Sequence, residues 1–488
     1  MKKLLILALM ACLVFGGASA SDEDVDLGGR TITVAVENAY PPYNYLDEAG
    51  NPIGWDYDVI NYICGQINCV AEFIETSWDG MIVAVSNGEF DMAADGITIT
   101  EERKELVDYS RGYVATDQVL LGRIDEERYT DGASLAAATD LVIGVQPGTT
   151  NYTVAIDLVG EGRVVAYDTF AIAVQALIAG DVDAVVMDDV AGMGYAGENA
   201  ESVKLIGTPL VPSDMLGFIF PKGSDLVHAI DSALEQMEAD RTLAYFNAKW
   251  ITATGLPDLG GRTVTVAVEN AYPPYNYLDE SGNPIGWDYD VINDICGRLN
   301  CVPEYIETSW DGMIVAVSNG EFDMAADGIT ITDERKELVD YSVGYVATDQ
   351  VLLVRLDEAR FASGEELVAD TALVVGVQPG TTNYTVAVEL VGESRVVAYD
   401  TFAIAVQALI AGDVDAVIMD DVAGAGYAGE NSESVKIVGD PLVPTDELGF
   451  IYPKGSELVE AFNLAFAEMR IDGSLKAYND FWILGLTE

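Results

Sequence analysis

The stretch ADGITITEER, residues 94–103, ends an apolar run and places several hydroxyl groups near a predicted helix start. It also places the carboxylate of Asp95 and the guanidinium of Arg103 there. A helix beginning near Thr100 would add free N–H groups, so the stretch has the donors of half a ligand clamp. The same stretch returns at residues 326–335 as ADGITITDER. One site in this stretch therefore predicts a second.

Nearly the whole sequence repeats at this same spacing of 232 residues. The motif DLGGR stands at 26–30 and at 258–262, and the match continues without a gap to Trp250 and Trp482. A period of this length is too long for a solenoid unit. Each copy is therefore predicted to be a pair of domains, joined to the other copy through a short segment near residues 252–257.

Composition indicates a globular chain with several domains. Half of the 488 residues are apolar, which suits packed cores, and the length exceeds what one core usually serves. The formal charge is −57, from 81 acidic and 24 basic residues. Such a field repels nucleic acids and anionic membrane surfaces, so no nucleic-acid partner is expected. We expect a monomer.

The N-terminus has the order of a secretory signal. Lys2 and Lys3 precede an apolar run at 4–15, and small residues follow as far as Ala20, after which cleavage is predicted. The run is shorter than a membrane span. The mature chain is therefore expected outside the cytoplasm, secreted or periplasmic. Cys12 follows Leu9-Met10-Ala11, which leaves a lipid anchor on the cell surface as an alternative.

The other four cysteines form two closely spaced pairs, one in each copy: Cys64 and Cys69, then Cys296 and Cys301. An exported chain favours disulfides, so we expect one disulfide within each copy. Four thiolates could instead bind zinc, although the spacing is loose for that metal. No metal site is otherwise predicted.

The first copy alternates strands and helices. Strands are predicted at 31–36, 70–74 and 90–94, with helices at 56–67 and from an N-cap at Ser77 to Val85; this order is typical of a parallel α/β sheet. A second unit has strands at 141–145, 164–167 and 182–187, and a helix at 170–179 between Thr169 and Gly180. Extended crossings at 113–123 and 216–221 connect the two units twice, which predicts two lobes.

Two loops at predicted strand ends could hold an anion between the lobes. ADGITIT offers Thr98 and Arg103, and QPGTT offers Thr149 and Thr150 with a helix N-terminus. In open α/β sheets, ligands bind beyond the carboxyl ends of strands. A carboxylate placed between these loops would contact both lobes.

Other strand ends add acids and aromatic rings. Asp188 is placed to meet an ammonium group, and Tyr40 and Trp78 could enclose a side chain. Glu37 and Asp95 make the site richer in acids than one zwitterion requires, which indicates a cationic ligand. Taken singly, each residue also has a structural explanation, such as a helix cap at Asp188 or a rim aromatic at Trp78.

Several segments together resemble a known family: AYPPYNYLDEAGNPIGWDYDV, SWDGMI, GITITEERKELVDYS, IGVQPGTTN and AGDVDAVVMDD. They are similar to the solute-binding proteins of polar amino-acid ABC importers, bacterial extracellular family 3. The resemblance implies two tandem modules of the type II periplasmic-binding-protein fold, each of two α/β lobes joined by two hinge crossings. The implied boundaries are a signal peptide at 1–20, a lead at 21–29, module 1 at 30–253 (lobe 1 at 30–116 and 214–253, lobe 2 at 117–213), a linker at 254–261 and module 2 at 262–488 (lobe 1 at 262–348 and 446–488, lobe 2 at 349–445).

The resemblance also implies roles for the site residues. Arg103, Thr98 and Thr150 would hold an α-carboxylate. Asp188 and the carbonyl of Gly96 would hold the α-amine, and Tyr40 and Trp78 would enclose the side chain. Histidine and basic amino-acid binders of the family have a cysteine pair where Cys64 and Cys69 lie, with a longer spacing. Asp95 replaces a small residue and tilts the expected ligand toward lysine, arginine or ornithine. The corresponding candidates in module 2 are Glu269, Tyr272, Trp310, Asp327, Gly328, Thr330, Arg335, Thr381, Thr382 and Asp420.

The expected function is capture by closure, in which the ligand binds better when both lobes contact it. No bond is made or broken, so neither an enzyme nor a cofactor is expected, and the partners are the amino acid and a membrane permease. Two alternatives remain: a sensing receptor without a transport role, and an enzyme similar to cyclohexadienyl dehydratase on the same fold. The only histidine, His228, is Glu460 in the second copy, which excludes a duplicated histidine mechanism.

Overall fold

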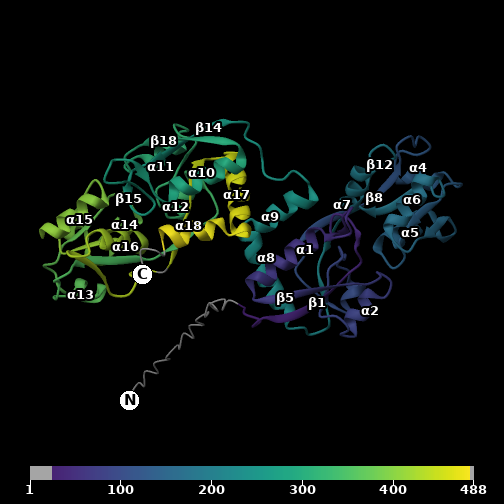
Figure 1. The fold of residues 1–488 in the computed structure, drawn as a ribbon, viewed down its shortest axis with the longest axis horizontal. Helices are drawn as coiled ribbons and strands as arrows, with labels where there is room; N and C mark the ends of the chain where they lie inside the picture. The colour runs from purple at the N-terminus through teal and green to yellow at the C-terminus, as the bar shows by residue number, and fades with distance from the viewer. Residues whose placement is uncertain (1–24, 444, 484–488) are drawn as a thin grey trace, which may run out of the picture.

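The computed structural model describes residues 25–443 and 445–483. The predicted signal peptide, Cys12 and part of the predicted lead lie outside these residues. Within the described ranges, no helix is both long and apolar enough to cross a membrane. Figure 1 shows two halves along the long axis of the molecule, and each half is one sequence copy. We call these halves module 1 and module 2.

Lobe 1 of module 1 has a five-stranded sheet in the order β5-β1-β6-β13-β7. β1 pairs in parallel with β5 and β6, whereas β13 pairs antiparallel with β6 and β7. The three strands predicted for this sheet therefore pair in parallel as expected. β13 adds antiparallel pairs, because it comes from the segment that returns from lobe 2 in the opposite direction. The elements are β1 (Arg30–Val36), α1 (Trp55–Gln66), β5 (Cys69–Glu75), α2 (Met81–Ser86), β6 (Met92–Ala93), α3 (Glu101–Lys104), β7 (Asp108–Tyr109), β13 (Ile219–Phe220), α8 (Leu226–Ala239) and α9 (Thr242–Phe246).

A small hairpin sheet, β2-β3-β4, follows β1 and carries residues of the cleft. Its strands are β2 (Ala39–Tyr40), β3 (Asn44–Leu46) and β4 (Pro52–Ile53).

Lobe 2 of module 1 has a sheet in the order β10-β9-β11-β8-β12. Its longest strands, β8 and β12, are also the crossings between the lobes, and they pair antiparallel at Val114 and Leu216. The chain therefore passes between the lobes twice, as predicted, and the two crossings lie side by side. The elements are β8 (Val114–Arg123), α4 (Gly132–Ala137), β9 (Ile143–Val145), α5 (Thr150–Val159), β10 (Val164–Ala166), α6 (Phe170–Ala179), β11 (Ala184–Asp188), α7 (Asp189–Glu198) and β12 (Val203–Leu216).

Module 2 repeats this arrangement, with sheets β18-β14-β19-β28-β20 and β24-β23-β25-β22-β26. One crossing is divided into β21 and β22, and β21 pairs with β27. The strands are β14 (Arg262–Val268), β18 (Cys301–Glu307), β19 (Met324–Ala325), β20 (Val339–Tyr341), β21 (Val346–Thr348), β22 (Gln350–Arg355), β23 (Val375–Val377), β24 (Val396–Ala398), β25 (Ala416–Asp420), β26 (Val435–Val438), β27 (Asp446–Leu448) and β28 (Ile451–Pro453). The longer helices are α10 (Trp287–Leu299), α14 (Thr382–Val391), α15 (Phe402–Ala411), α16 (Asp421–Glu430), α17 (Leu458–Asp472) and α18 (Ser474–Trp482).

Local sequence explains where two of the helices begin. Thr169 accepts a hydrogen bond from the backbone N–H of Ile172, and Gly180 ends α6 in a left-handed conformation, as predicted. The predicted N-cap at Ser77 is wrong, because α2 begins only at Met81. Gly80, at φ 88°, turns the chain immediately before that helix.

Both predicted disulfides are present, between Cys64 and Cys69 and between Cys296 and Cys301. Each joins the end of the first helix of a module to the strand that follows it. Because all four sulfur atoms are bonded in pairs, the zinc alternative is wrong.

Candidate ligand-binding site

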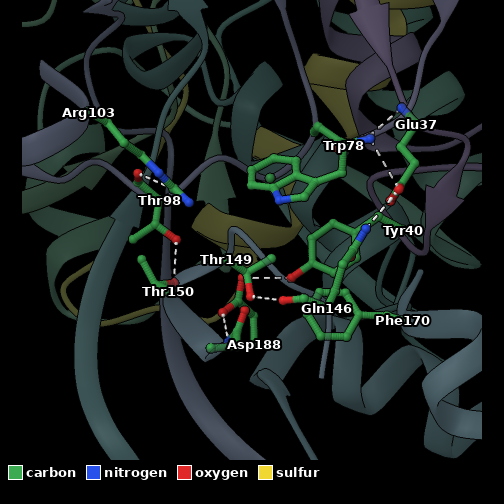
Figure 2. A pocket seen from close by; sticks show the side chains of 13 residues that line it. Glu37, Tyr40, Trp78, Thr98, Arg103, Gln146, Thr149, Thr150, Phe170 and Asp188 are labelled. Carbon is green, nitrogen blue, oxygen red and sulfur yellow. Dashed lines mark hydrogen bonds between the residues drawn. The ribbon is translucent and has the colours of Figure 1, made fainter. Parts of the chain in front are cut away.

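Each module has a pocket between its two lobes. Figure 2 shows the pocket of module 1, where side chains from both lobes point toward one another. It contains all ten residues predicted for this module: Glu37, Tyr40, Trp78, Asp95, Gly96, Thr98, Arg103, Thr149, Thr150 and Asp188. Three lining residues were not predicted: Gln146, Asn151 and Phe170. Gln146 lies in the QPGTT loop and Phe170 begins the helix predicted at 170–179, but neither residue was assigned a role in ligand binding.

Arg103 connects the two lobes. Thr100 accepts a hydrogen bond from the Arg103 backbone N–H, which caps the short helix α3. The Nη1 atom donates to the carbonyl of Thr98 in lobe 1 at 3.0 Å, and Nη2 donates to that of Gly148 in lobe 2 at 3.1 Å. The guanidinium carbon lies 5.4 Å from the centre of the Trp78 ring. A guanidinium has five donors, so these two hydrogen bonds do not exhaust its capacity to bind a ligand carboxylate.

The two predicted threonine positions also meet across the cleft. Thr98 and Thr150 share a hydrogen bond between their hydroxyls at 3.3 Å. Thr149 caps α5 by accepting from the N–H of Tyr152, so its hydroxyl orients the helix start toward the pocket. Donors from both lobes therefore converge beside Arg103.

Asp188 supplies a buried negative charge at the end of β11. It accepts hydrogen bonds from the hydroxyl of Tyr40 at 2.7 Å and from the side-chain amide of Asn151 at 3.0 Å. Burial raises the pKa of Asp188 to about 6, while these two hydrogen bonds act to lower it. The carboxylate is therefore mainly ionised at neutral pH and can face an ammonium group.

Glu37 and Asp95 form a second acidic centre. Asn44 donates to Asp95 at 2.8 Å, and Gln146, from lobe 2, donates to Glu37 at 2.8 Å. Burial raises the pKa of both carboxyl groups, and the charge of Asp95 raises the pKa of Glu37 further. Burial likewise raises the pKa of Glu269 and of Asp327 in module 2. A cation placed here would favour the ionised form of both acids.

Aromatic rings close the pocket on the other side. The Tyr40 ring stacks on that of Phe170 from lobe 2, with ring centres 5.5 Å apart. Gly96 allows this approach, because a Cβ atom on it would lie 2.7 Å from a carbon of the Tyr40 ring. Its φ of 56° also favours glycine. Phe170 therefore adds a wall that the sequence had not indicated.

Module 2 reproduces the site residue by residue. Its pocket is lined by Glu269, Tyr272, Trp310, Asp327, Gly328, Thr330, Arg335, Gln378, Thr381, Thr382, Asn383, Phe402 and Asp420. Arg335 donates to the carbonyls of Thr330 and Gly380 at 3.0 and 3.2 Å, and Tyr272 donates to Asp420 at 2.7 Å. The residue types and contacts match those of module 1, so the two pockets offer a ligand the same chemistry.

One contact outside the pocket also joins the lobes. The hydroxyl of Tyr195, on α7 of lobe 2, donates to the backbone carbonyl of Ala39 in lobe 1 at 2.8 Å. In module 2, Tyr427 makes the same contact with Ala271 at 2.7 Å. The two lobes of each module are therefore closed on each other in this structure.

Comparison with known proteins identifies the family of the chain. The family model of bacterial extracellular solute-binding proteins, family 3, matches residues 32–253 and again residues 264–485. The chain therefore belongs to this family and contains its unit twice in tandem. The predicted fold class, two modules of the type II periplasmic-binding-protein fold, is confirmed.

Relatives of known specificity match one unit at a time. An L-cystine-binding protein of Escherichia coli is 28% identical over 222 residues, which are 45% of this chain and 82% of that protein. An L-arginine-binding protein of Pseudomonas aeruginosa is 29% identical over 256 residues, covering 49% of this chain and 95% of that protein. A solved structure of an ancestral amino acid-binding protein, described as a precursor of cyclohexadienyl dehydratase, is 31% identical with a TM-score of 0.43 and covers 45% of this chain and 95% of that one.

Proposed function

We propose that each module captures one polar amino acid in its cleft and delivers it to an ABC importer. The observation that carries this proposal is the pairing of Arg103 with Asp188 across one pocket built from both lobes. A guanidinium and a buried carboxylate at opposite ends of a small pocket suit the two charges of an α-amino acid. Membership of the solute-binding family supports the same function.

In the proposed pose, Arg103 and the hydroxyls of Thr98 and Thr150 hold the α-carboxylate. Asp188 and the carbonyl of Gly96 hold the α-amine. The N-terminal end of α5, capped by Thr149, adds partial positive charge near the carboxylate. The same roles in module 2 fall to Arg335, Thr330, Thr382, Asp420 and Gly328.

The side chain of the ligand is proposed to be cationic. Beyond the zwitterion pair, the pocket holds two further carboxyl groups, Glu37 and Asp95, and no basic residue besides Arg103 among those that line it. A buried carboxylate without a counterion is costly, and a cationic side chain would remove that cost. Tyr40 and Trp78 provide apolar surface for the aliphatic part. Lysine, arginine and ornithine fit this pattern.

Closure supplies the mechanism. A ligand that contacts Arg103 in lobe 1 and Asp188 in lobe 2 binds the closed form better than the open form, and this difference shifts the population toward closure. Hydrogen bonds to charged groups contribute about 1.5–3 kcal/mol each, so these two residues supply a large share of the about 8 kcal/mol that micromolar binding requires. No covalent step is proposed, and the chain is proposed to act outside the cytoplasm.

Isothermal titration calorimetry with each of the twenty amino acids and ornithine tests this function. We expect binding of a basic amino acid with nearly two ligands per chain, because the two pockets have the same lining. Absence of heat with every ligand would refute the amino-acid proposal. Recovery of the ligand unchanged after incubation is also expected, whereas its conversion into a product would favour the enzyme alternative.

A further inference from the structure

Two helices from different modules lie against each other at the centre of the molecule. α17 of module 2 contacts α9 of module 1 (Figure 1). Arg241 donates to Glu460 at 2.5 Å, and the hydroxyl of Tyr245 donates to Glu468 at 3.1 Å. Ile471 packs against the hydrophobic core of module 1. These contacts combine charge pairing with apolar packing.

The contacting face of α17 differs from its counterpart in module 1. Five positions at helical spacing share this face: Glu460, Leu464, Ala467, Glu468 and Ile471. Every one differs from its equivalent on α8: His228, Ser232, Glu235, Gln236 and Ala239. All thirteen residues that line the pocket, in contrast, are of the same type in both modules. The copies therefore differ at every position of this face, whereas the pocket lining is the same in both.

The equivalent positions of α17 and α8 also differ in how deeply they are buried. Leu464 is 7% exposed and Ala467 is fully buried, although both lie on a helix side that a single module would leave to solvent. The equivalent Glu235 on α8 is exposed and makes a surface ion pair with Arg111. α17 therefore has a second apolar side in addition to the one that packs on its own module, which is typical of a helix covered on both sides.

The opposing face on α9 is also particular to module 1. Arg241 and Tyr245 correspond to Gly473 and Ala477 in module 2, and both of these are exposed. The Tyr245 partner, Glu468, is held in place by Arg298, whose Nη1 atom donates to it at 2.8 Å. Module 1 has Gln66 at the position of Arg298. Each side of the contact therefore has residues that its repeat lacks.

The segment between the modules is short and ordered. The backbone N–H groups of Thr254 and Gly255 both donate to the carbonyl of Ala248. Leu256 and Leu259 then pack against the hydrophobic core of module 2. The link therefore acts as a fixed connection and not as a flexible tether.

We propose that the two modules are docked through their first lobes as one rigid pair, by the face of α9 in module 1 and the face of α17 in module 2. The partner of each module is thus the other module of the same chain. The intermodule contacts named above all come from described residues of the first lobes, and the second lobes lie at the two ends of the molecule (Figure 1). As a consequence that rests on the proposed function, each second lobe can open and close independently, so the two sites bind without cooperativity.

Distance measurement by electron spin resonance tests the docking without any ligand, so its outcome does not depend on the proposed function. Spin labels are attached through Val83→Cys on α2 and Val315→Cys on α11 (Met313–Ser318), two exposed first-lobe positions. The chain is purified under oxidising conditions so that the two disulfides stay formed. We expect a single narrow distance distribution. A broad distribution in this otherwise unmodified chain would overturn the proposal.

Substitutions then locate the interface. Tyr245→Ala combined with Ile471→Asp is expected to lose the narrow distribution, because it removes a hydrogen bond and places a charge against an apolar surface. The matched control is Ala239→Asp with Ala477→Ser, which changes the equivalent exposed positions and should leave the distribution unchanged. A narrow distribution that survives the first pair, or is lost in the control, would contradict the assignment.

A charge exchange covers the case in which the first pair does not fold. Arg241 and Glu460 are both more than one third exposed, so their substitution should not disturb either core. Arg241→Glu faces Glu460 with a like charge and is expected to widen the distribution, and adding Glu460→Arg is expected to restore it. An unchanged distribution in Arg241→Glu, or no recovery in the exchanged pair, would also overturn the proposal.

Discussion

Replacing Arg103 by alanine should remove ligand binding from module 1 and leave module 2 unaffected. Among the described residues that line this pocket, Arg103 is the only basic one, and two of its five donors already contact carbonyls on opposite lobes. The substitution removes the proposed partner of the α-carboxylate and one connection between the closed lobes. Both effects act in the same direction and weaken binding.

The size of the effect follows from the donors that remain. The guanidinium can give two hydrogen bonds to one carboxylate, and hydrogen bonds to charged groups contribute about 1.5–3 kcal/mol each. Loss of both amounts to at least about 3 kcal/mol, which is an affinity loss of roughly 100-fold or more. A site that binds at about micromolar affinity would then bind at about 0.1 mM or weaker, outside the range of a titration at low protein concentration.

The duplicated chain provides its own control. Calorimetric titration should give nearly two ligands per chain for the unmodified protein and nearly one for either Arg103→Ala or Arg335→Ala. The double variant should show no binding in the same concentration range. Full stoichiometry in the double variant would refute the clamp assignment, and loss of both sites in a single variant would refute independent pockets.

Three further results are expected. Affinity for a basic amino acid should increase as the pH rises toward 8, because burial raises the pKa of Glu37 to about 8 and a bound cation displaces its proton. Calorimetric titrations in two buffers of different ionisation enthalpy should show this proton release. Binding that does not depend on pH would contradict a cationic side chain beside these acids. Tyr195→Phe should lower the affinity of module 1 by roughly 2- to 10-fold with unchanged stoichiometry, since one interlobe hydrogen bond of about 0.5–1.5 kcal/mol is lost. The affinity of module 1 is measured in a chain that also carries Arg335→Ala, so that module 2 does not bind. An unchanged affinity would exclude a contribution of Tyr195 to closure. Replacing Cys64 and Cys69 by alanine should lower the free energy of unfolding by about 2 kcal/mol, because the disulfide closes a short loop; denaturant unfolding measures this, and equal stability would show that the cross-link does not contribute.

The strand ends made the pocket predictable from sequence. All ten predicted residues of module 1 line one pocket, because the carboxyl ends of parallel strands meet at one edge of a sheet and the double crossing brings two such edges together. Phe170 and Asn151 were missed for a physical reason. Phe170 is the first residue of an apolar helix, and Asn151 lies in the first turn of α5 just after its cap, so the local sequence of neither indicates a cleft position. Only the tertiary fold places both side chains in the pocket.

The strands and helices were predictable where local signals were strong. α6 is an uninterrupted apolar run between a capping threonine and a glycine, so both of its ends were evident. α2 begins later than expected because Gly80 competes with the capping signal at Ser77. The antiparallel strands β7 and β13 have two residues each, which is too short for an alternating pattern to be recognised.

The unequal faces of the two copies also determine where assembly stops. When two different surfaces of one repeating unit are complementary, units can associate head to tail without limit. Such contacts form filaments unless one of the surfaces is absent from a terminal unit. In this chain the complementary faces occur once each, because Gly473 and Ala477 replace Arg241 and Tyr245 at one end, and Glu235 replaces Ala467 at the other. Neither end of the pair offers the face that another module would need. A third copy appended to the chain would be tethered to the pair but would have no site at which to dock.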